Sequence, residues 1–221
     1  MINFFLRIKN KIGFFITFIV QTNNWYKRSF NNPVPDFIKR KYLVGILKNK
    51  NSAWIETGTF LGKTTIFLSN NSNFVISLEP SKECYIKAKE NTKYKSNILL
   101  INENSENGLK KAVDIIVNKY AGDYIGFWLD GHYSGGITYQ NEIISPIKEE
   151  LEIIFNAIKK GDLPYKNIYI FIDDIRLFIG SVTEEEKRYP SLDYISKKLS
   201  EFGFTISIAN DILTAIKIDE K

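Results

Sequence analysis

The sequence predicts an α/β protein: a doubly wound sheet of about seven strands, mostly parallel, with an antiparallel hairpin at its C-terminal end. Three observations carry this prediction. Five short apolar runs alternate with stretches of helical pattern between residues 50 and 201, which is typical of strand–helix–strand units. The runs are almost continuously apolar, as expected of parallel strands buried on both faces. The chain end differs, because there two apolar runs flank a short turn.

Each apolar run defines a strand, and each stretch after it defines a helix. The first strand is expected at 53–55, followed by a glycine-containing loop and a helix from about Lys63. The next four units are, in order, a strand at 74–78 with a helix opened by Pro80, a strand at 97–101 with a helix at about 107–119, a strand at 124–129 with a helix at about 142–159, and a strand at 168–172 with a helix at about 190–201. The hairpin pairs 204–208 with 212–218 around the turn at 209–211.

Charge divides the chain into two predicted parts, a basic, apolar helical extension at 1–49 and a domain at 50–221. Residues 1–50 contain ten Lys or Arg and one acid, a net charge of +9. Residues 51–221 contain 20 bases and 24 acids, a net charge of −4. Because nucleic-acid binding needs a basic face on the folded domain, no nucleic-acid partner is expected.

The first 30 residues suggest a docking segment. On a helix, one face would carry apolar side chains, among them Ile8, Ile12, Ile16 and Ile19. Basic residues interrupt the apolar run, so a membrane span is not expected, and no small-residue cleavage site follows. Two interpretations stay open: an interfacial helix on an anionic membrane, or packing against the chain's own domain or a second subunit. The single cysteine, Cys84, excludes an intrachain disulfide. A cytoplasmic protein fits, peripheral at the inner face of the membrane under the first interpretation.

Candidate site residues follow the predicted strands, because ligands of open α/β sheets bind beyond the carboxyl ends of the strands. In chain order, the polar residues and glycines at these positions are Glu56, Gly58, Thr59 and Gly62; Glu79; Ser105; Asp130 and His132; and Asp173 with Asp174. Glu79 lies 23 residues after Glu56. An acid at that place can accept hydrogen bonds from ribose hydroxyls.

The sequence of the first loop can be compared with two known nucleotide-binding patterns. A dinucleotide fingerprint needs three glycines, and this loop has only Gly58 and Gly62. A P-loop ends in Gly-Lys-Ser/Thr, which Gly62-Lys63-Thr64 supplies, but Thr57 stands where its first glycine belongs. A P-loop-like nucleotide-dependent kinase or hydrolase therefore stays an alternative.

The remaining pattern, E-x-G-x-x-x-G with an acid after the second strand and a terminal hairpin, resembles the class I S-adenosylmethionine-dependent methyltransferases over residues 50–218. Those proteins have a Rossmann-like sheet. The resemblance implies that the ribose is bound by Glu79 and that Ser105 lies near the adenine. It implies that the rest of S-adenosylmethionine is lined by Glu56, Gly58, Thr59, Gly62 and Asp130.

A narrower resemblance comes from Trp128-Leu129-Asp130-Gly131-His132-Tyr133 and Phe171-Ile172-Asp173-Asp174. It is similar to the macrocin-type, magnesium-dependent O-methyltransferases that act on sugar hydroxyls. The resemblance implies a divalent cation, Mg²⁺ or similar, held by Asp130, Asp173 and Asp174. The sequence departs from that group at His132, where an Asp is typical.

The resulting expectation is an S-adenosylmethionine-dependent O-methyltransferase for a small polar acceptor such as a sugar or sugar nucleotide. The cation would lower the pKa of the acceptor hydroxyl. His132 is the first choice for general base, with a substrate contact or a metal ligand as its other roles, and Asp130 shares the catalytic site. Asp173 and Asp174 would otherwise be structural, with Lys63 or Arg176 as counter-charge. A non-catalytic cofactor-binding module that docks through its N-terminus is a further alternative.

Overall fold

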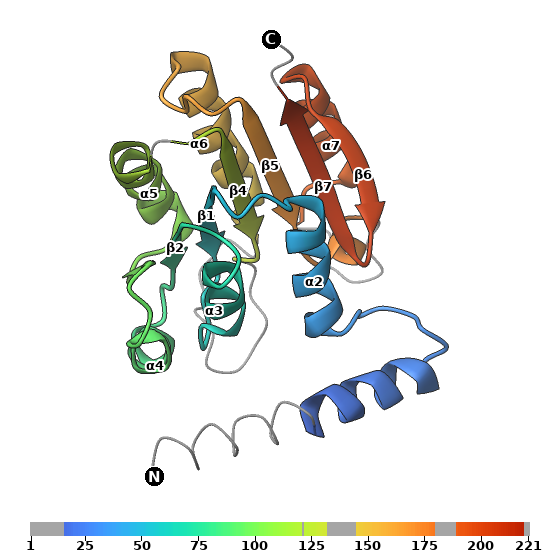
Figure 1. Cartoon of the computed structure of the whole chain (residues 1–221). Helices are drawn as coiled ribbons and strands as arrows, with labels where there is room; N and C mark the ends of the chain where they lie inside the picture. Colours follow the sequence, from blue (N-terminus) through green and yellow to red (C-terminus); the bar gives the residue numbers. More distant parts are fainter. Residues whose placement is uncertain (1–15, 121, 132–144, 180–188, 219–221) are drawn as a thin grey trace.

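The computed structural model describes residues 16–120, 122–131, 145–179 and 189–218. One seven-stranded sheet has the order β3-β2-β1-β4-β5-β7-β6 (Figure 1). The strands are β1 Ser52–Thr57, β2 Phe74–Leu78, β3 Ile98–Ile101, β4 Tyr124–Leu129, β5 Asn167–Ile172, β6 Thr205–Ala209 and β7 Ile212–Ile218. Strands β1 to β5 pair in parallel, and β7 runs antiparallel to both β5 and β6. The predicted fold class, including the C-terminal hairpin, is confirmed.

Helices connect the strands as expected, with small shifts at their ends. They are α2 Asp36–Ile46, α3 Lys63–Ser69, α4 Lys82–Thr92, α5 Ser105–Lys119, α6 Ile147–Lys160 and α7 Leu192–Glu201, with a short 3-10 helix η1 Ile175–Phe178 after β5. The start of α4 lies after Pro80 because the Ser81 side chain caps it, accepting the Cys84 amide. The start of α5 lies before residue 107 because the Asn104 side chain caps it, accepting the Asn107 amide.

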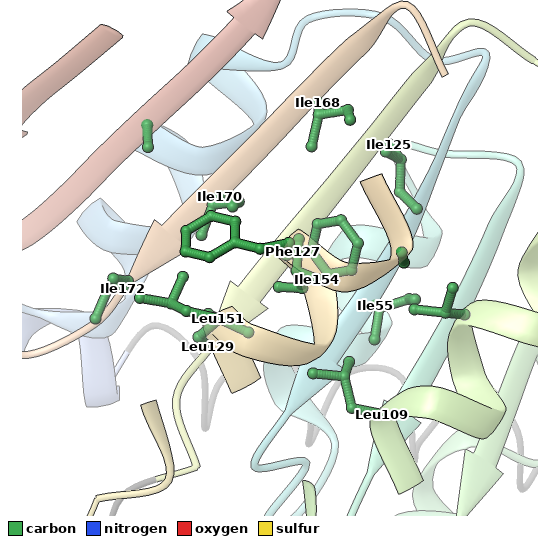
Figure 2. Close-up of a cluster of buried hydrophobic side chains, with 14 of the residues drawn as sticks. Ile55, Leu109, Ile125, Phe127, Leu129, Leu151, Ile154, Ile168, Ile170 and Ile172 are labelled. Carbon is green, nitrogen blue, oxygen red and sulfur yellow. The ribbon is translucent and has the colours of Figure 1, made fainter. Parts of the chain in front are cut away.

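The sheet is buried on both faces by separate groups of helices. On one face, α5, α6 and α7 cover a cluster that includes Ile55, Phe127 and Ile170 (Figure 2). On the other face, α2 and α3 pack over Trp54 and Phe171, whose rings stack with centroids 5.5 Å apart. Because both faces carry apolar side chains, the strands read as continuous apolar runs in the sequence.

Helix α2 is packed into this second cluster. Its Leu43 is fully buried, and Leu47 just after it is 3% exposed. The hydroxyls of Tyr42 and Thr214 lie 3.0 Å apart, which joins α2 to β7. The segment 36–47 therefore completes one face of the sheet.

Residues 16–27 form a further helix that precedes α2 and extends away from the sheet (Figure 1). The rings of Phe18 and Phe37 lie 4.7 Å apart, so it contacts the start of α2. Ile16, Ile19 and Val20 are about half exposed. Among the described residues, none of the helices combines the length and the apolar character that crossing a membrane requires.

Candidate functional site

The loop after β1 is shaped by two glycines in the left-handed region. Gly58 has a φ of +86°, and a Cβ there would lie 2.3 Å from the backbone oxygen of Asp130. Gly62, with a φ of +80°, precedes α3. The loop thus passes directly beside the end of β4, and only glycine allows this approach. This junction lies where the strand order reverses between β1 and β4, the usual ligand position in open α/β sheets.

Most amides of this loop are already hydrogen-bonded within the chain. The amides of Gly58 and Thr59 both donate to the Leu78 carbonyl at 3.0 Å, and the Gly62 amide donates to the Thr59 carbonyl at 2.8 Å. The Phe60 amide donates to Glu79 Oε2 at 2.6 Å. The loop is therefore held to the end of β2 rather than offering these amides to a phosphate.

Glu56, at the end of β1, is fully buried in a cluster of hydroxyls. Its Oε2 accepts hydrogen bonds from Thr65 Oγ1 at 2.5 Å and Ser77 Oγ at 2.6 Å. Burial raises the pKa of Glu56 to about 7, although these two bonds oppose the rise. The Thr59 hydroxyl lies 2.5 Å from Ser77 Oγ, so Thr59 supports the loop from inside. Its contact with a cofactor stays a prediction.

Glu79 follows β2 and is 5% exposed. Its Oε1 accepts the Ser81 amide at 2.9 Å, and its Oε2 accepts the Phe60 amide. Burial raises the pKa of Glu79, and the two amide bonds oppose this rise. Each carboxylate oxygen can accept a second hydrogen bond, so the side chain is fixed in place and can still accept ribose hydroxyls.

Ser105 is the first residue of α5, beside the end of β3. The Ser105 residue is 8% exposed. Nearby, Asn102 Nδ2 donates to the Glu79 carbonyl at 2.7 Å, which ties the end of β3 to the end of β2. Ser105 and Glu79 therefore follow neighbouring strands on the same edge of the sheet.

Asp130 follows β4 and stands next to the glycine loop. Its amide lies 3.2 Å from the Thr57 carbonyl, to which it donates. Burial raises the pKa of its carboxyl well above the usual range, and the charges of Asp173 and Asp174 raise it further. The structure thus brings the three predicted carboxylates near one another, as the adjacency of β4 and β5 requires.

Lys39 of α2 lies against the two acids that follow β5. Its Nζ donates to Asp173 Oδ1 at 2.6 Å and to Asp174 Oδ1 at 2.5 Å. The Lys39 residue is 6% exposed. Burial lowers the pKa of Lys39, but the two carboxylates outweigh this and raise it overall. Burial also raises the pKa of Asp173, to about 6, while Lys39 opposes that rise.

The β6–β7 turn adds a fourth carboxylate to this cluster. Asp211 Oδ2 accepts a hydrogen bond from Arg176 Nη1 and lies 3.9 Å from Lys39 Nζ. Arg176 Nη1 also donates to Asp174 Oδ1 at 2.6 Å. Asp174 itself has a backbone φ of +51°, which is uncommon for a residue other than glycine. The neighbouring cations are thus Arg176, as predicted, and Lys39 in place of Lys63.

This arrangement does not fit the divalent cation implied by the sequence. Lys39 Nζ already contacts both Asp173 and Asp174, so an ammonium group stands between the expected ligands. In the part of the chain that the structure describes, no group of three or more His, Cys, Asp or Glu side chains is arranged to hold a metal ion. The prediction of a magnesium site is therefore not supported by the described residues.

Sequence reasoning missed three residues of this region, and one predicted residue cannot be placed. Lys39 was missed, as was Phe60, which is 45% exposed in the glycine loop with a φ of +49°. Glu150 of α6 was also missed. It is 1% exposed, and its Oε1 would lie 3.1 Å from a Cβ on Gly131. His132, the predicted base, lies outside the described residues.

Comparison with known proteins supports the fold. No protein-family model matches the chain, and no curated protein matches it. Among solved structures, the chain is similar to a protein assigned as a caffeoyl-CoA O-methyltransferase from Staphylococcus aureus, with a TM-score of 0.53 and 17% identity over 88% of this chain and 91% of that one. It is also similar to the N-methyltransferase NodS from Bradyrhizobium japonicum, with a TM-score of 0.49 and 13% identity over 84% of this chain and 97% of that one. The first likeness and the strand order show that the chain has a Rossmann-like α/β fold similar to the fold of that protein.

Proposed function

We propose that this protein is an S-adenosylmethionine-dependent O-methyltransferase for a small polar acceptor, such as a sugar or sugar nucleotide. One observation carries the proposal. At the switch point of the sheet, the glycine loop approaches Asp130 so closely that a Cβ on Gly58 would lie 2.3 Å from the backbone oxygen of Asp130. The same loop is bonded to Glu79 through the Phe60 amide, and Asp130 lies near the acids that follow β5. A cofactor site and a charged acceptor site would therefore share one edge.

The loop geometry favours this function over a P-loop kinase or hydrolase. A P-loop binds phosphate through free backbone N–H groups. Here four loop amides already donate hydrogen bonds to other groups of the chain, namely those of Gly58, Thr59, Phe60 and Gly62. The Glu79 carboxylate would also repel a triphosphate, whereas it suits hydroxyls and a cationic sulfonium.

The chemistry requires a base and close positioning. The acceptor oxygen forms a bond to the methyl carbon, the bond from that carbon to sulfur breaks, and the acceptor proton passes to a base. Asp130 is one candidate base, because it follows β4 beside the glycine loop and burial raises the pKa of its carboxyl. His132 remains the other candidate base. In-line attack then depends mainly on how well the two substrates are held.

The acceptor is inferred from the carboxylates around it. Lys39 and Arg176 form ion pairs with Asp173, Asp174 and Asp211 at this edge, and Asp130 interacts electrostatically with Asp173, Asp174 and Lys39. Carboxylates accept hydrogen bonds from hydroxyl groups, and cations donate to acceptor oxygens. A hydroxyl-rich small molecule matches this set of groups better than an apolar one.

Titration calorimetry with S-adenosylhomocysteine and with ATP tests the cofactor. We expect S-adenosylhomocysteine to bind at micromolar concentration and ATP to bind at least a hundred-fold more weakly. Glu79→Ala should weaken S-adenosylhomocysteine roughly ten-fold or more, since it removes the acceptor of ribose hydroxyls. Glu90→Ala, which removes an exposed carboxylate on α4, is the matched control. Tight ATP binding without S-adenosylhomocysteine binding would overturn the proposal.

A further inference from the structure

Lys39 is the unexpected member of the carboxylate cluster. It comes from α2, 134 residues before Asp173 in the chain. Its single ammonium group contacts Asp173 and Asp174 and lies 3.9 Å from Asp211. One cation therefore meets carboxylates from the end of β5 and from the β6–β7 turn. An ammonium group has three N–H donors. Two of them bond to Asp173 and Asp174, the acids that the sequence resemblance implies as metal ligands.

A purely structural role accounts poorly for this cluster. Burying charges costs free energy, and well-packed apolar side chains often stabilise a protein as much as a buried ion pair or more. Asp174 of the cluster also lies in the left-handed region, which is uncommon for a residue other than glycine. Such features gather where a side chain must be held in a particular place for function.

The charges of the cluster do not cancel. Four carboxylates, those of Asp130, Asp173, Asp174 and Asp211, stand beside two cations, Lys39 and Arg176. With every group ionised, four negative charges less two positive ones would leave an excess of two. Burial raises the pKa of Asp130 and of Asp173, so protonation of these two carboxyls reduces that excess. Lys39 already occupies the point between Asp173 and Asp174, where a cationic ligand would otherwise bind.

We propose that the Lys39 ammonium takes the place of a divalent cation at this site, so that methyl transfer by this protein needs no metal. The inference rests on the proposed function. Lys39 is a positioning residue: it holds Asp173 and Asp174 in fixed orientations toward the acceptor and supplies the positive charge that a metal would supply. The helix that carries it, α2, is then part of the active site.

Binding of Mn²⁺, followed by its electron paramagnetic resonance signal, tests this without an activity assay. The full chain should leave the signal of free Mn²⁺ unchanged up to millimolar concentration. In Lys39→Met the carboxylates lose their ammonium, so Mn²⁺ should bind at least ten-fold more tightly. Adding Asp173→Asn to that variant should abolish the gain. Lys39→Arg, which keeps the charge, should behave like the unaltered chain.

Two outcomes would overturn the inference. One is micromolar Mn²⁺ binding by the unaltered chain that Asp173→Asn abolishes, because a metal would then displace Lys39. The other is a folded Lys39→Met variant, judged by circular dichroism, that gains no Mn²⁺ affinity. If Lys39→Met does not fold, Mn²⁺ binding by the unaltered chain and by Lys39→Arg is the test, and micromolar binding that Asp173→Asn abolishes would again overturn the inference. S-adenosylhomocysteine calorimetry on the same samples keeps failure of the proposed function separate, since it measures the cofactor and not the cation.

Discussion

Gly58 is the residue whose backbone sets the approach between the cofactor loop and β4. A Cβ there would meet the backbone oxygen of Asp130 at 2.3 Å, and the φ of +86° is itself unfavourable for other residues. Gly58→Ala should therefore lower the free energy of unfolding by roughly 3–4 kcal/mol, measured by urea denaturation.

Gly161→Ala is the matched control for that substitution. Gly161 has a φ of +74°, but a Cβ there would meet nothing within 4 Å. Only backbone strain of about 1 kcal/mol is then expected. If both variants lose the same free energy of unfolding, the close approach of Gly58 to Asp130 adds nothing to the cost of Gly58→Ala.

Glu56 links stability to pH. Burial raises its pKa to about 7 from an ordinary 4.5, so the folded state binds more protons than the unfolded state between these values. The free energy of unfolding should therefore fall as pH rises from about 4.5 to about 7, by about 3 kcal/mol from this group. Glu56→Gln should remove that fall, so the variant is expected to be more stable than the unaltered chain at pH 8.

Unfolding by urea at pH 5 and at pH 8 measures this effect. The difference between the unaltered chain and Glu56→Gln isolates Glu56 from Asp130 and Asp173, whose pKa values are also raised. Glu90→Gln, at an exposed position, should follow the unaltered chain. The prediction would be contradicted if the free energy of unfolding changed between pH 5 and pH 8 by the same amount in Glu56→Gln and in the unaltered chain.

At the scale of the element, the helix at residues 16–27 is the part that needs a partner. Ile16, Ile19 and Val20 are about half exposed, and residues 1–30 contain five Lys or Arg and no acid. Apolar side chains together with basic charge suit an anionic membrane surface. We expect the full chain to float with vesicles that contain anionic lipid and not with neutral vesicles, and the binding to weaken with salt.

One matched pair of substitutions sharpens this test. Ile19→Glu should reduce flotation several-fold, because it places a negative charge on the exposed face of the helix. Ile86→Glu makes the same change at a similarly exposed position on α4 and should leave flotation unchanged. Concentration-dependent dimerisation without flotation would favour packing against a second subunit instead.

At the scale of the whole molecule, the strands were predictable because a strand buried on both faces needs apolar residues at nearly every position, which produces a continuous apolar run in the sequence. The residues at the strand ends were predictable for the same reason, since Glu56, Glu79 and Asp130 directly follow such runs. Helix starts were less predictable, because caps such as Ser81 and Asn104 compete with other polar residues nearby.

Lys39 could not be predicted as part of the site, because its partners lie at least 134 residues away and it stands in the basic run Lys39-Arg40-Lys41. One signal was present. Lys39, Leu43 and Leu47 are spaced four residues apart, so they share one face of a helix, and the two leucines mark that face as buried.

The same spacing predicts how far the folded unit extends. A chain that begins at residue 50 lacks Leu43 and Leu47, whose burial contributes on the order of 5 kcal/mol together, and it lacks Lys39 beside Asp173 and Asp174. Because small domains have only about 5–15 kcal/mol of net stability, residues 50–221 should unfold at much lower urea concentration than residues 31–221. A chain that begins at residue 31 keeps α2 and should match the full chain closely. Equal urea midpoints for the two shortened chains would show that the sheet is complete without α2 and that the predicted boundary at residue 50 divides two independent parts.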